Sequence, residues 1–371
     1  MTAVALPTRM KAVLLTGHGG FEKLDYRDDV ALPVLTPDDV LIRVGAAAVN
    51  NTDINTRAGW YSKSVDQASE AGGAAGFSEA RIEDAGWTGA PPRFPRIQGA
   101  DVCGTIVAVG DRVDPARIGE RVLVEPVFRA AGRFDAVYFG SECDGGFAQY
   151  AKAPSVHAHR IVSPLSDVEL ASFPCAYSAA ENLVTRVGLA AGEHVLVTGA
   201  SGGVGSAAVQ LAKRRGAMVT AIVATDKADD VLALGADTVI ARDADPRIGY
   251  GQDCFDAAID VVGGGAFGRI LESLKRGGRY GVAGAIAGPV VDLDLRTLYL
   301  KDLRLIGCTV LEREVFANLV SYIERGEVRP LVAGVYSLAD IVAGQQAFLA
   351  KRHVGKIVLV GSIPAKVPNA T

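Results

Sequence analysis

Two domains of α/β type are predicted from this chain: one β-barrel-like and one built on a doubly wound parallel sheet. A glycine-rich turn at 199–205 directly follows the strand-like run 194–198 and precedes a helical run from Ser206 to Arg215. The rhythm of the chain also changes. Before about residue 160, short β-rich runs are separated by Gly and Pro, and after about residue 177 strand-like and helical runs alternate. Alternation is typical of a parallel sheet covered by helices, and Gly/Pro-punctuated β-rich runs are typical of a barrel.

The expected elements follow in chain order. The barrel-like part contains the β-rich runs 40–44, 104–109 and 121–124. The parallel sheet is expected from the runs 194–198, 218–223, 238–240, 255–261, 279–283 and 303–307, with helices at 229–234 and 266–274. Further helices are expected at 315–325 and 338–350, and the run 356–360 is a strand candidate for the first domain. The predicted limits are 177–310 for the sheet domain, and 1–176 with 311–371 for the other.

Composition indicates an ordinary soluble globular protein. The chain has 371 residues, of which 49% are hydrophobic and 22% charged, enough for two full cores. Its net charge of -4 comes from interspersed signs, so we expect a small-molecule substrate and neither nucleic acid nor membrane as partner. No apolar run reaches the roughly 18 residues of a membrane span, and the N-terminus lacks the apolar core of a signal peptide. A cytoplasmic location is therefore expected.

The cysteines predict no disulfide framework and no clustered zinc site. Five of them are spread along the chain without a CxxC pair: Cys103, Cys143, Cys175, Cys254 and Cys308. Disulfide-rich domains and structural zinc sites both need cysteines that the fold brings close together, and closely spaced pairs are their usual signature. We expect reduced thiols.

The glycine turn predicts a dinucleotide site at Ser201, Gly202, Gly203, Val204 and Gly205. The helix after the turn directs its free N–H groups and the positive end of its dipole toward a pyrophosphate. Glycine is needed there because a Cβ would collide with the phosphates or force an unfavourable φ. The alternative interpretation is a tight turn between strand and helix, and the turn by itself leaves it open.

Taken in order, several motifs resemble those of the medium-chain dehydrogenases and reductases, and within them the zinc-free quinone oxidoreductase branch. The segment Asn50, Asp53, Arg57, Gly59 and Tyr61 is similar to the branch's N-x-x-D-x-x-x-R-x-G-x-Y. The remaining matches, in family order, are 99–104, 144–150, 199–205, 234–237, 260–264 and 354–358. The resemblance implies a GroES-like catalytic domain in two pieces around a Rossmann domain, with the active site in the cleft between them.

The same resemblance argues against zinc. Zinc alcohol dehydrogenases of this superfamily bind the catalytic metal at positions that here read Asn50, Ala100 and Cys175. A catalytic zinc needs three protein donors, and alanine supplies none. The lobe that carries four cysteines in zinc-bearing relatives is here the run 127–142, which has none. We therefore expect neither catalytic nor structural zinc.

Without a Lewis acid, the predicted chemistry is hydride delivery to a conjugated C=C or a quinone. The charge that develops there is spread over several atoms, so hydrogen bonds can stabilise it. An unactivated alcohol is harder, because its hydroxyl must lose a proton near neutral pH. Two alternatives stay open: a zinc-independent alcohol or aldehyde dehydrogenase, and a protein that binds a dinucleotide without turnover.

Three residues are candidates for the chemistry. Tyr61 is the candidate proton donor or enolate clamp, and the alternative is a rim tyrosine that packs on substrate. Asn50 is the candidate amide donor, and the alternative is a side chain that stabilises a turn. Ser178 matches a family position that contacts the nicotinamide amide, and the alternative is a helix N-cap. Asp53 and Arg57 are four residues apart, which favours a local ion pair.

NADPH is the expected cofactor, with NADH the less favoured one. In NAD-selective Rossmann folds the second strand ends in Asp or Glu, which would repel a 2′-phosphate. Here the strand 219–223 is followed by Ala224, and Thr225 and Lys227 are candidate donors to the phosphate. If the strand ends two residues later, Asp226 stands at its end, and the preference for NADPH over NADH is reversed.

Three further assignments rest on the resemblance. Lys356 matches a position where relatives place a basic residue on the pyrophosphate; the alternative is a solvated lysine at a strand end. Gly284, after the fifth strand, is expected near the nicotinamide or its ribose. The run Leu303–Gly307 is similar to the edge strand that relatives pair across a two-fold axis, so a homodimer is expected.

The chain departs from the family between residues 62 and 93. This insertion is rich in Gly, Ala and Ser, with Phe77 and Trp87 as its anchors. Long loops inside compact domains tend to be functional. We expect it to form part of the substrate rim or a lid; the alternative is a surface excursion packed on the barrel.

Overall fold

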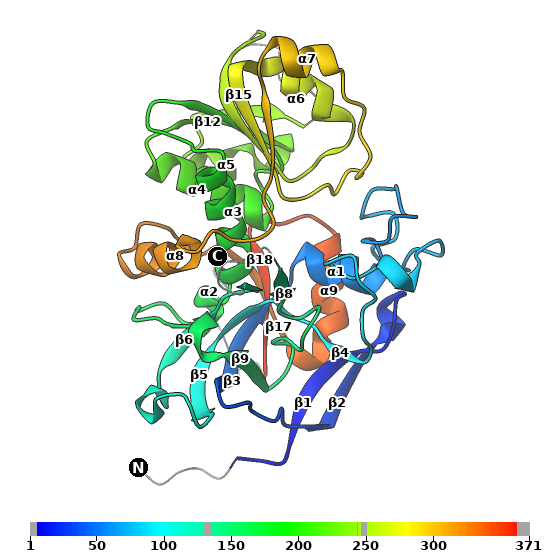
Figure 1. The fold of residues 1–371 in the computed structure, drawn as a ribbon, viewed down its shortest axis with the longest axis vertical. Helices are drawn as coiled ribbons and strands as arrows, with labels where there is room; N and C mark the ends of the chain where they lie inside the picture. Colours follow the sequence, from blue (N-terminus) through cyan, green and yellow to red (C-terminus); the bar gives the residue numbers. More distant parts are fainter. Residues whose placement is uncertain (1–5, 130–134, 243, 246–250, 362–371) are drawn as a thin grey trace.

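The computed structural model describes residues 6–129, 135–242, 244–245 and 251–361. The chain forms two lobes, with the parallel-sheet domain above the barrel-like domain in the view of Figure 1. Of the described residues, no helix is long and apolar enough to cross a membrane.

The upper lobe contains a six-stranded parallel sheet in the order β13-β12-β11-β14-β15-β16. Its strands are β11 (His194–Val197), β12 (Met218–Val223), β13 (Thr238–Ala241), β14 (Phe255–Asp260), β15 (Leu274–Val282) and β16 (Arg304–Gly307). The expected doubly wound sheet is confirmed, and β12 has the predicted bounds. β15 begins five residues before the expected run 279–283, because the chain passes straight from a helix into the strand.

Helices cover both faces of this sheet. They are α3 (Pro174–Arg186), α4 (Gly203–Arg214), α5 (Ala228–Ala233), α6 (Phe267–Ser273) and α7 (Leu295–Leu300). Alternate residues of β11 serve the two faces: Val195 and Val197 pack with α3 and α4, while Leu196 packs with residues of α6. Because both faces are buried, strands inside the sheet such as β11 and β12 are mostly apolar runs, which is why they could be located in the sequence.

The lower lobe is built around the long strand β3 (Asp39–Ala48). β3 pairs with β5 (Asp101–Val109), with β9 (Tyr150–Pro154) and with β18 (Lys356–Val360), all antiparallel. The sheet continues through β6 (Arg121–Val124) and β10 (Ala158–Arg160) on one side and β17 (Val332–Ser337) on the other. The C-terminal strand thus returns to the first domain, as predicted.

The remaining elements of the lower lobe are short. A three-stranded sheet is formed by β2 (Leu24–Ala31), β1 (Arg9–Leu15) and β4 (Arg96–Ile97), and a two-stranded one by β7 (Val127–Arg129) and β8 (Ala136–Tyr138). The helices are α1 (Asn51–Ala58), α2 (Asp167–Leu170), α8 (Val315–Glu324) and α9 (Ile341–Leu349). Helix α3 runs through the expected domain limit between 176 and 177, and α8 packs against α3. The domain limits themselves stay a prediction.

Candidate active site

A cavity of about 270 Å³ lies between the two lobes. The barrel-like domain and α3 contribute aromatic and polar side chains to its wall, and the Rossmann domain contributes the start of α4 and the loop after β15. Seven of the predicted site residues line it: Asn50, Tyr61, Ser178, Gly203, Val204, Gly284 and Lys356. The expected cleft site is therefore a real pocket, formed by segments that are far apart in the sequence.

The glycine turn brings the N-terminus of α4 to this pocket. The helix begins at Gly203, three residues before the expected Ser206, with the exposed Gly202 as its N-cap. Gly199 has φ of 59°, a left-handed conformation that favours glycine. A Cβ on Gly205 would lie 2.2 Å from the carbonyl oxygen of Gly199, so only glycine lets the helix start this close to the turn. This geometry fits the pyrophosphate of a dinucleotide, with its N–H groups directed outward.

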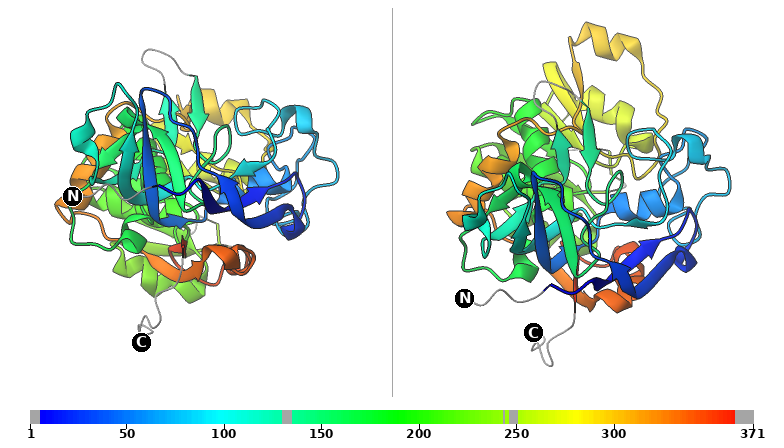
Figure 2. Two further views of the ribbon diagram at one scale, coloured as in Figure 1. Left: turned by 90° about the horizontal axis from the view of Figure 1, so that it is seen from below. Right: turned by 60° about the horizontal axis from the view of Figure 1, so that its bottom comes forward.

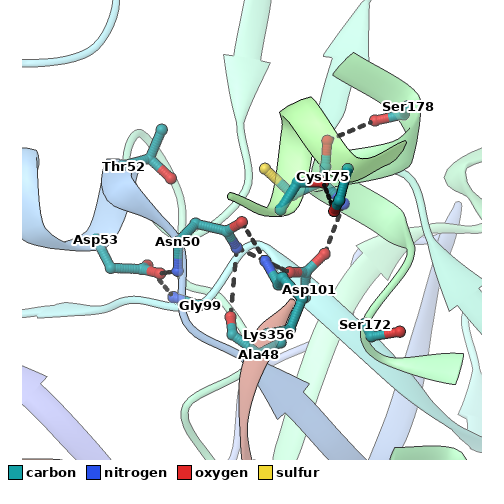
Figure 3. A network of polar contacts seen from close by, with 12 residues as sticks. Ala48, Asn50, Thr52, Asp53, Gly99, Asp101, Ser172, Cys175, Ser178 and Lys356 are labelled. Atoms are coloured by element: carbon teal, nitrogen blue, oxygen red, sulfur yellow. Dashed lines mark hydrogen bonds and ion pairs between the residues drawn. The ribbon is translucent and has the colours of Figure 1, made fainter. Parts of the chain in front are cut away.

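Lys356 lies at the cavity and not at a solvated strand end. It is buried, its ammonium donates to Asn50 Oδ1, and the Lys356 Nζ to Asp101 Oδ2 distance is 2.8 Å. Figure 3 shows Lys356, Asn50 and Asp101 converging from β18, the segment before α1 and the start of β5. Asp101 also accepts from the backbone N–H of Cys175, at 2.5 Å. The solvated-lysine interpretation is wrong, and the ammonium already has two partners other than a pyrophosphate.

The amide hydrogens of Asn50 are engaged within the protein. Its Nδ2 donates to Asp101 Oδ2 at 2.8 Å and to the carbonyl of Ala48 at 3.3 Å. A side-chain amide has two N–H donors, so neither remains for a substrate in this arrangement. Asn50 lines the pocket as predicted, but here it holds Lys356 and Asp101 together.

The positions that would bind a catalytic zinc do not form a metal site. Ala100 has no donor atom, and the Lys356 ammonium stands beside Asn50. The Cys175 Sγ lies 3.0 Å from the Tyr138 hydroxyl. Within the described ranges there is no group of three or more His, Cys, Asp or Glu that could hold a metal ion. The donor set is therefore unsuited to Zn²⁺, which needs three deprotonated or neutral ligands.

Tyr61 and Ser178 both line the cavity. Burial raises the pKa of Tyr61 well above its ordinary value, so its hydroxyl stays protonated and can donate at neutral pH. Ser178 is buried inside α3, where its hydroxyl donates to the carbonyl of Cys175 at 3.2 Å. The alternative of an N-cap is wrong, because α3 begins at Pro174, four residues earlier.

The expected ion pair between Asp53 and Arg57 is wrong. Arg57 is fully buried and donates to Gln345 Oε1 at 3.0 Å, and to the carbonyls of Gly19 at 2.8 Å and Gly73 at 2.6 Å. Asp53 accepts from the backbone N–H groups of Asn50 at 2.8 Å and Gly99 at 3.1 Å. The i,i+4 spacing suggested a local pair, but Arg57 bonds to distant segments, and Asp53 caps the start of α1 and accepts from Gly99.

Asp53 makes the stability of the fold depend on pH. Burial raises its pKa to about 7, although hydrogen bonds from backbone N–H groups oppose that shift. The pKa of Asp53 in the folded protein thus exceeds the ordinary value of 3.8. The contribution of protonated Asp53 to the free energy of unfolding is therefore fully present below about pH 4 and is lost as pH rises toward 7. The loss is up to about 1.4 kcal/mol per pH unit in this window.

Since Asn does not titrate, Asp53→Asn should gain stability relative to wild type between pH 5 and 7 in urea unfolding. A difference that does not vary with pH would contradict this expectation.

The residues after β12 lie at the end of the strand as expected. β12 ends at Val223, so Ala224 follows it directly, half-buried, with Thr225 and Asp226 exposed beyond it. Lys227 is buried, and its ammonium donates to the carbonyl of Lys351. Its contact with a 2′-phosphate therefore stays a prediction that would require this bond to rearrange.

The insertion at 62–93 contributes to the pocket wall and touches both domains. Trp87 lines the cavity and packs on Tyr138, with 4.9 Å between ring centroids. Phe77 packs in a small cluster with Ala58 and Val65. The backbone N–H of Ser69 donates to the carbonyl of Ile286 at 2.9 Å, in the loop after β15. Figure 2 shows the insertion beside that loop in both views. Part of the insertion is thus a rim of the pocket, as expected.

Sequence reasoning missed three members of the site. Tyr138 lies on β8, within the cysteine-free run 127–142, and Trp60 lines the pocket beside Tyr61. Asp101 belongs to the motif 99–104, for which the resemblance implies no site role for this carboxylate. The sequence did offer one signal for Asp101: its carboxylate opens an otherwise apolar strand. A charge buried there requires a partner, and this indicates a polar site.

A Rossmann domain joined to a GroES-like domain across such a pocket defines an NAD(P)-dependent oxidoreductase. Residues 36–163 match the alcohol dehydrogenase GroES-like domain, and residues 203–325 match the zinc-binding dehydrogenase family. A structure from Sinorhizobium meliloti described as a "putative alcohol dehydrogenase" is 44% identical with a TM-score of 0.85, covering 96% of this chain and 97% of that one. This chain belongs to the medium-chain dehydrogenase/reductase superfamily.

Two curated relatives are similar over almost their whole length. The acryloyl-coenzyme A reductase of Metallosphaera sedula is 28% identical, covering 94% of this chain and 99% of the relative. The quinone oxidoreductase of Lama guanicoe is 29% identical, and the similarity covers 95% of this chain and 97% of that relative. The predicted resemblance to the quinone oxidoreductase branch is confirmed at this level.

Proposed function

We propose that this chain reduces a quinone or an α,β-unsaturated carbonyl compound with NADPH, without catalytic zinc. The observation that carries the proposal is the buried Lys356–Asp101–Asn50 group, in which an ammonium contacts Asn50, one of the positions matched to the zinc ligands of relatives. A second cation beside this ammonium would be repelled, and Ala100 offers it no ligand. The names of the curated relatives, a quinone oxidoreductase and an acryloyl-coenzyme A reductase, support the same reaction class.

The chain's own residues fit this chemistry. A dinucleotide bound at the glycine turn supplies the hydride. The wall of the cavity brings Trp60, Tyr61, Trp87 and Tyr138 around a small apolar space that suits a flat substrate and keeps water from the reacting atoms. Tyr61, held protonated by burial, is the proposed proton donor.

The test is anaerobic consumption of NADPH with a panel of quinones and α,β-unsaturated ketones, combined with metal analysis of the purified protein. Turnover with less than about one zinc per ten chains is the expected result. Oxidation of a plain alcohol that depends on added zinc would contradict the proposal. Tight NADPH binding with no turnover of any substrate would favour the non-catalytic alternative.

A zinc-independent alcohol or aldehyde dehydrogenase is the second candidate. The description of the 44% identical Sinorhizobium meliloti protein favours it. The same panel separates the two, because an alcohol dehydrogenase would oxidise alcohols in the presence of NADP⁺ and leave quinones unchanged.

Tyr61→Phe is expected to lower the turnover number by about 100-fold, within the usual range for loss of a general acid. NADPH affinity should change little, because Tyr61 lies after α1 and is not part of the glycine turn that is proposed to hold the dinucleotide. Steady-state kinetics and fluorescence titration with NADPH measure the two quantities. An unchanged turnover number would remove Tyr61 from the chemistry.

The preference for NADPH is proposed from Ala224, which leaves room for a 2′-phosphate just beyond β12. Ala224→Asp places a carboxylate at that point, which would accept from a ribose hydroxyl and repel the phosphate. We expect the NADPH/NADH selectivity ratio, measured as kcat/KM, to fall by about tenfold or more. Asp226→Ala is the matched control and should leave the ratio within about twofold. If Ala224→Asp lowered kcat/KM equally for NADPH and NADH, the placement of the 2′-phosphate beside Ala224 would be contradicted.

A homodimer and a cytoplasmic location are also proposed. β16 is an edge strand of its sheet and carries the exposed Leu305, and further exposed apolar side chains belong to α7 just before it, at Leu295, Tyr299 and Leu300. Exposed apolar side chains at a sheet edge favour burial against a second copy. Light scattering should give twice the mass of 38.6 kDa, and a monomeric mass at micromolar concentration would contradict the dimer.

A further inference from the structure

The Lys356 ammonium has donor capacity beyond the hydrogen bond that it makes within the protein. An ammonium carries three donors; Asn50 Oδ1 accepts a hydrogen bond from it, and Asp101 Oδ2 forms an ion pair with the nitrogen at 2.8 Å. No third acceptor lies within hydrogen-bonding distance in the part of the chain that the structure describes. Lys356 also lines the cavity, and its side chain is only 4% exposed.

The ammonium is held in place by groups that are themselves fixed. Asp101 has no exposed surface and is held by the backbone N–H of Cys175 and by Asn50 Nδ2. The stem of Lys356 lies against the start of α4, since a Cβ on Gly203 would be 3.1 Å from Lys356 Cδ. A donor that is positioned before substrate arrives needs no reorganisation when charge develops beside it.

We propose that Lys356 is the catalytic oxyanion donor of this enzyme, and that Asn50 and Asp101 are its positioning residues. This inference rests on the proposed reduction of a quinone or α,β-unsaturated carbonyl. In that reaction a bound dinucleotide would supply a hydride, which forms the new C–H bond at the β-carbon and leaves the dinucleotide oxidised. The C=C electron pair moves so that the carbonyl oxygen becomes the oxyanion of an enolate. The Lys356 N–H donates to that oxygen, and the α-carbon then takes a proton from water, directly or through the Tyr61 hydroxyl.

Binding of p-nitrophenol to the protein without dinucleotide tests the oxyanion site independently of turnover. The ionised phenol absorbs visible light and resembles an enolate in its charge. The wild type should bind the ionised form at least tenfold more tightly than the neutral form. Lys356→Met should reduce this preference to within twofold. No preference in the wild type would overturn the proposal.

Two further variants keep this test interpretable. The double variant Lys356→Met with Asp101→Asn removes both buried charges, so it should fold even where the single variant does not, and it should also lose the preference. Lys213→Met removes a lysine that forms a surface ion pair with Asp237 at 2.8 Å, and it should keep the preference of the wild type. A double variant that still prefers the ionised phenol would overturn the proposal.

Kinetics separate this role from pyrophosphate binding and from failure of the proposed function. Lys356→Met should lower kcat for an α,β-unsaturated ketone by at least 100-fold. It should lower kcat less for a quinone, because the reduced form of a quinone is a weaker base. The Kd of NADPH should change by less than threefold. A tenfold rise in that Kd with unchanged kcat would overturn the oxyanion role and assign Lys356 to the pyrophosphate. A wild type that prefers the ionised phenol but turns over no substrate would overturn the proposed function alone.

Discussion

Lys356→Met is expected to lower the free energy of unfolding by about 3–5 kcal/mol, as is usual when one partner of a buried ion pair is removed. The variant leaves the Asp101 carboxylate with no exposed surface and no counter-charge. The two remaining donors, Asn50 Nδ2 and the backbone N–H of Cys175, stabilise the carboxylate only in part. Urea unfolding followed by circular dichroism measures the change.

The matched control is the double variant Lys356→Met with Asp101→Asn, which should recover most of the loss because no unpaired charge stays buried. Lys213→Met, at the surface, should change stability by less than about 0.5 kcal/mol. A loss of less than about 1 kcal/mol in the free energy of unfolding of Lys356→Met would contradict this expectation. A double variant no more stable than the single one would likewise show that Lys356 does not stabilise the buried charge of Asp101.

Gly205→Ala is expected to weaken dinucleotide binding by about tenfold or more and to lower stability by about 1–3 kcal/mol, the usual cost of overpacking. The added methyl would lie 2.2 Å from the carbonyl oxygen and 2.6 Å from the carbonyl carbon of Gly199, both of them backbone atoms. The turn must move to accommodate it, and the N–H groups at the start of α4 move with the turn. Fluorescence titration with NADPH and thermal unfolding measure the two effects.

Gly268→Ala is the control for this substitution. Gly268 lies in α6, and a Cβ there would have no neighbour within 4 Å, so the change should be neutral or slightly stabilising. NADPH affinity in Gly205→Ala equal to that of wild type would mean that the glycine turn is not the pyrophosphate site.

The sequence alone located most of the Rossmann domain because its physics is local. Buried strands such as β11 and β12 are mostly apolar runs, so their positions can be found from a few neighbouring residues. The start of β15 was missed because Lys275, Arg276, Gly277 and Gly278 have the composition of a turn. The start of α4 was placed late for a related reason: glycines are poor helix formers, yet here they form the first turn.

The partners of the site residues could not be predicted in the same way. Arg57 bonds to Gln345, which is 288 residues away, and Lys356 bonds to Asn50 across 306 residues. Motif order indicated that Asn50 and Tyr61 face a cleft, but not which groups would use up the amide hydrogens of Asn50. A short-range rule, the i,i+4 pairing of Asp53 with Arg57, gave the wrong partners because both side chains point into the tertiary structure.

The aromatic wall of the pocket gives the protein a built-in optical probe. The chain has two tryptophans, and both of them, Trp60 and Trp87, line the cavity. Trp87 belongs to the insertion, whereas Trp60 follows α1, so the two indoles reach the cavity from separate segments. The tryptophan fluorescence of the unlabelled chain therefore originates at the candidate site, and replacing either indole by phenylalanine would leave a single tryptophan emitter with a known position.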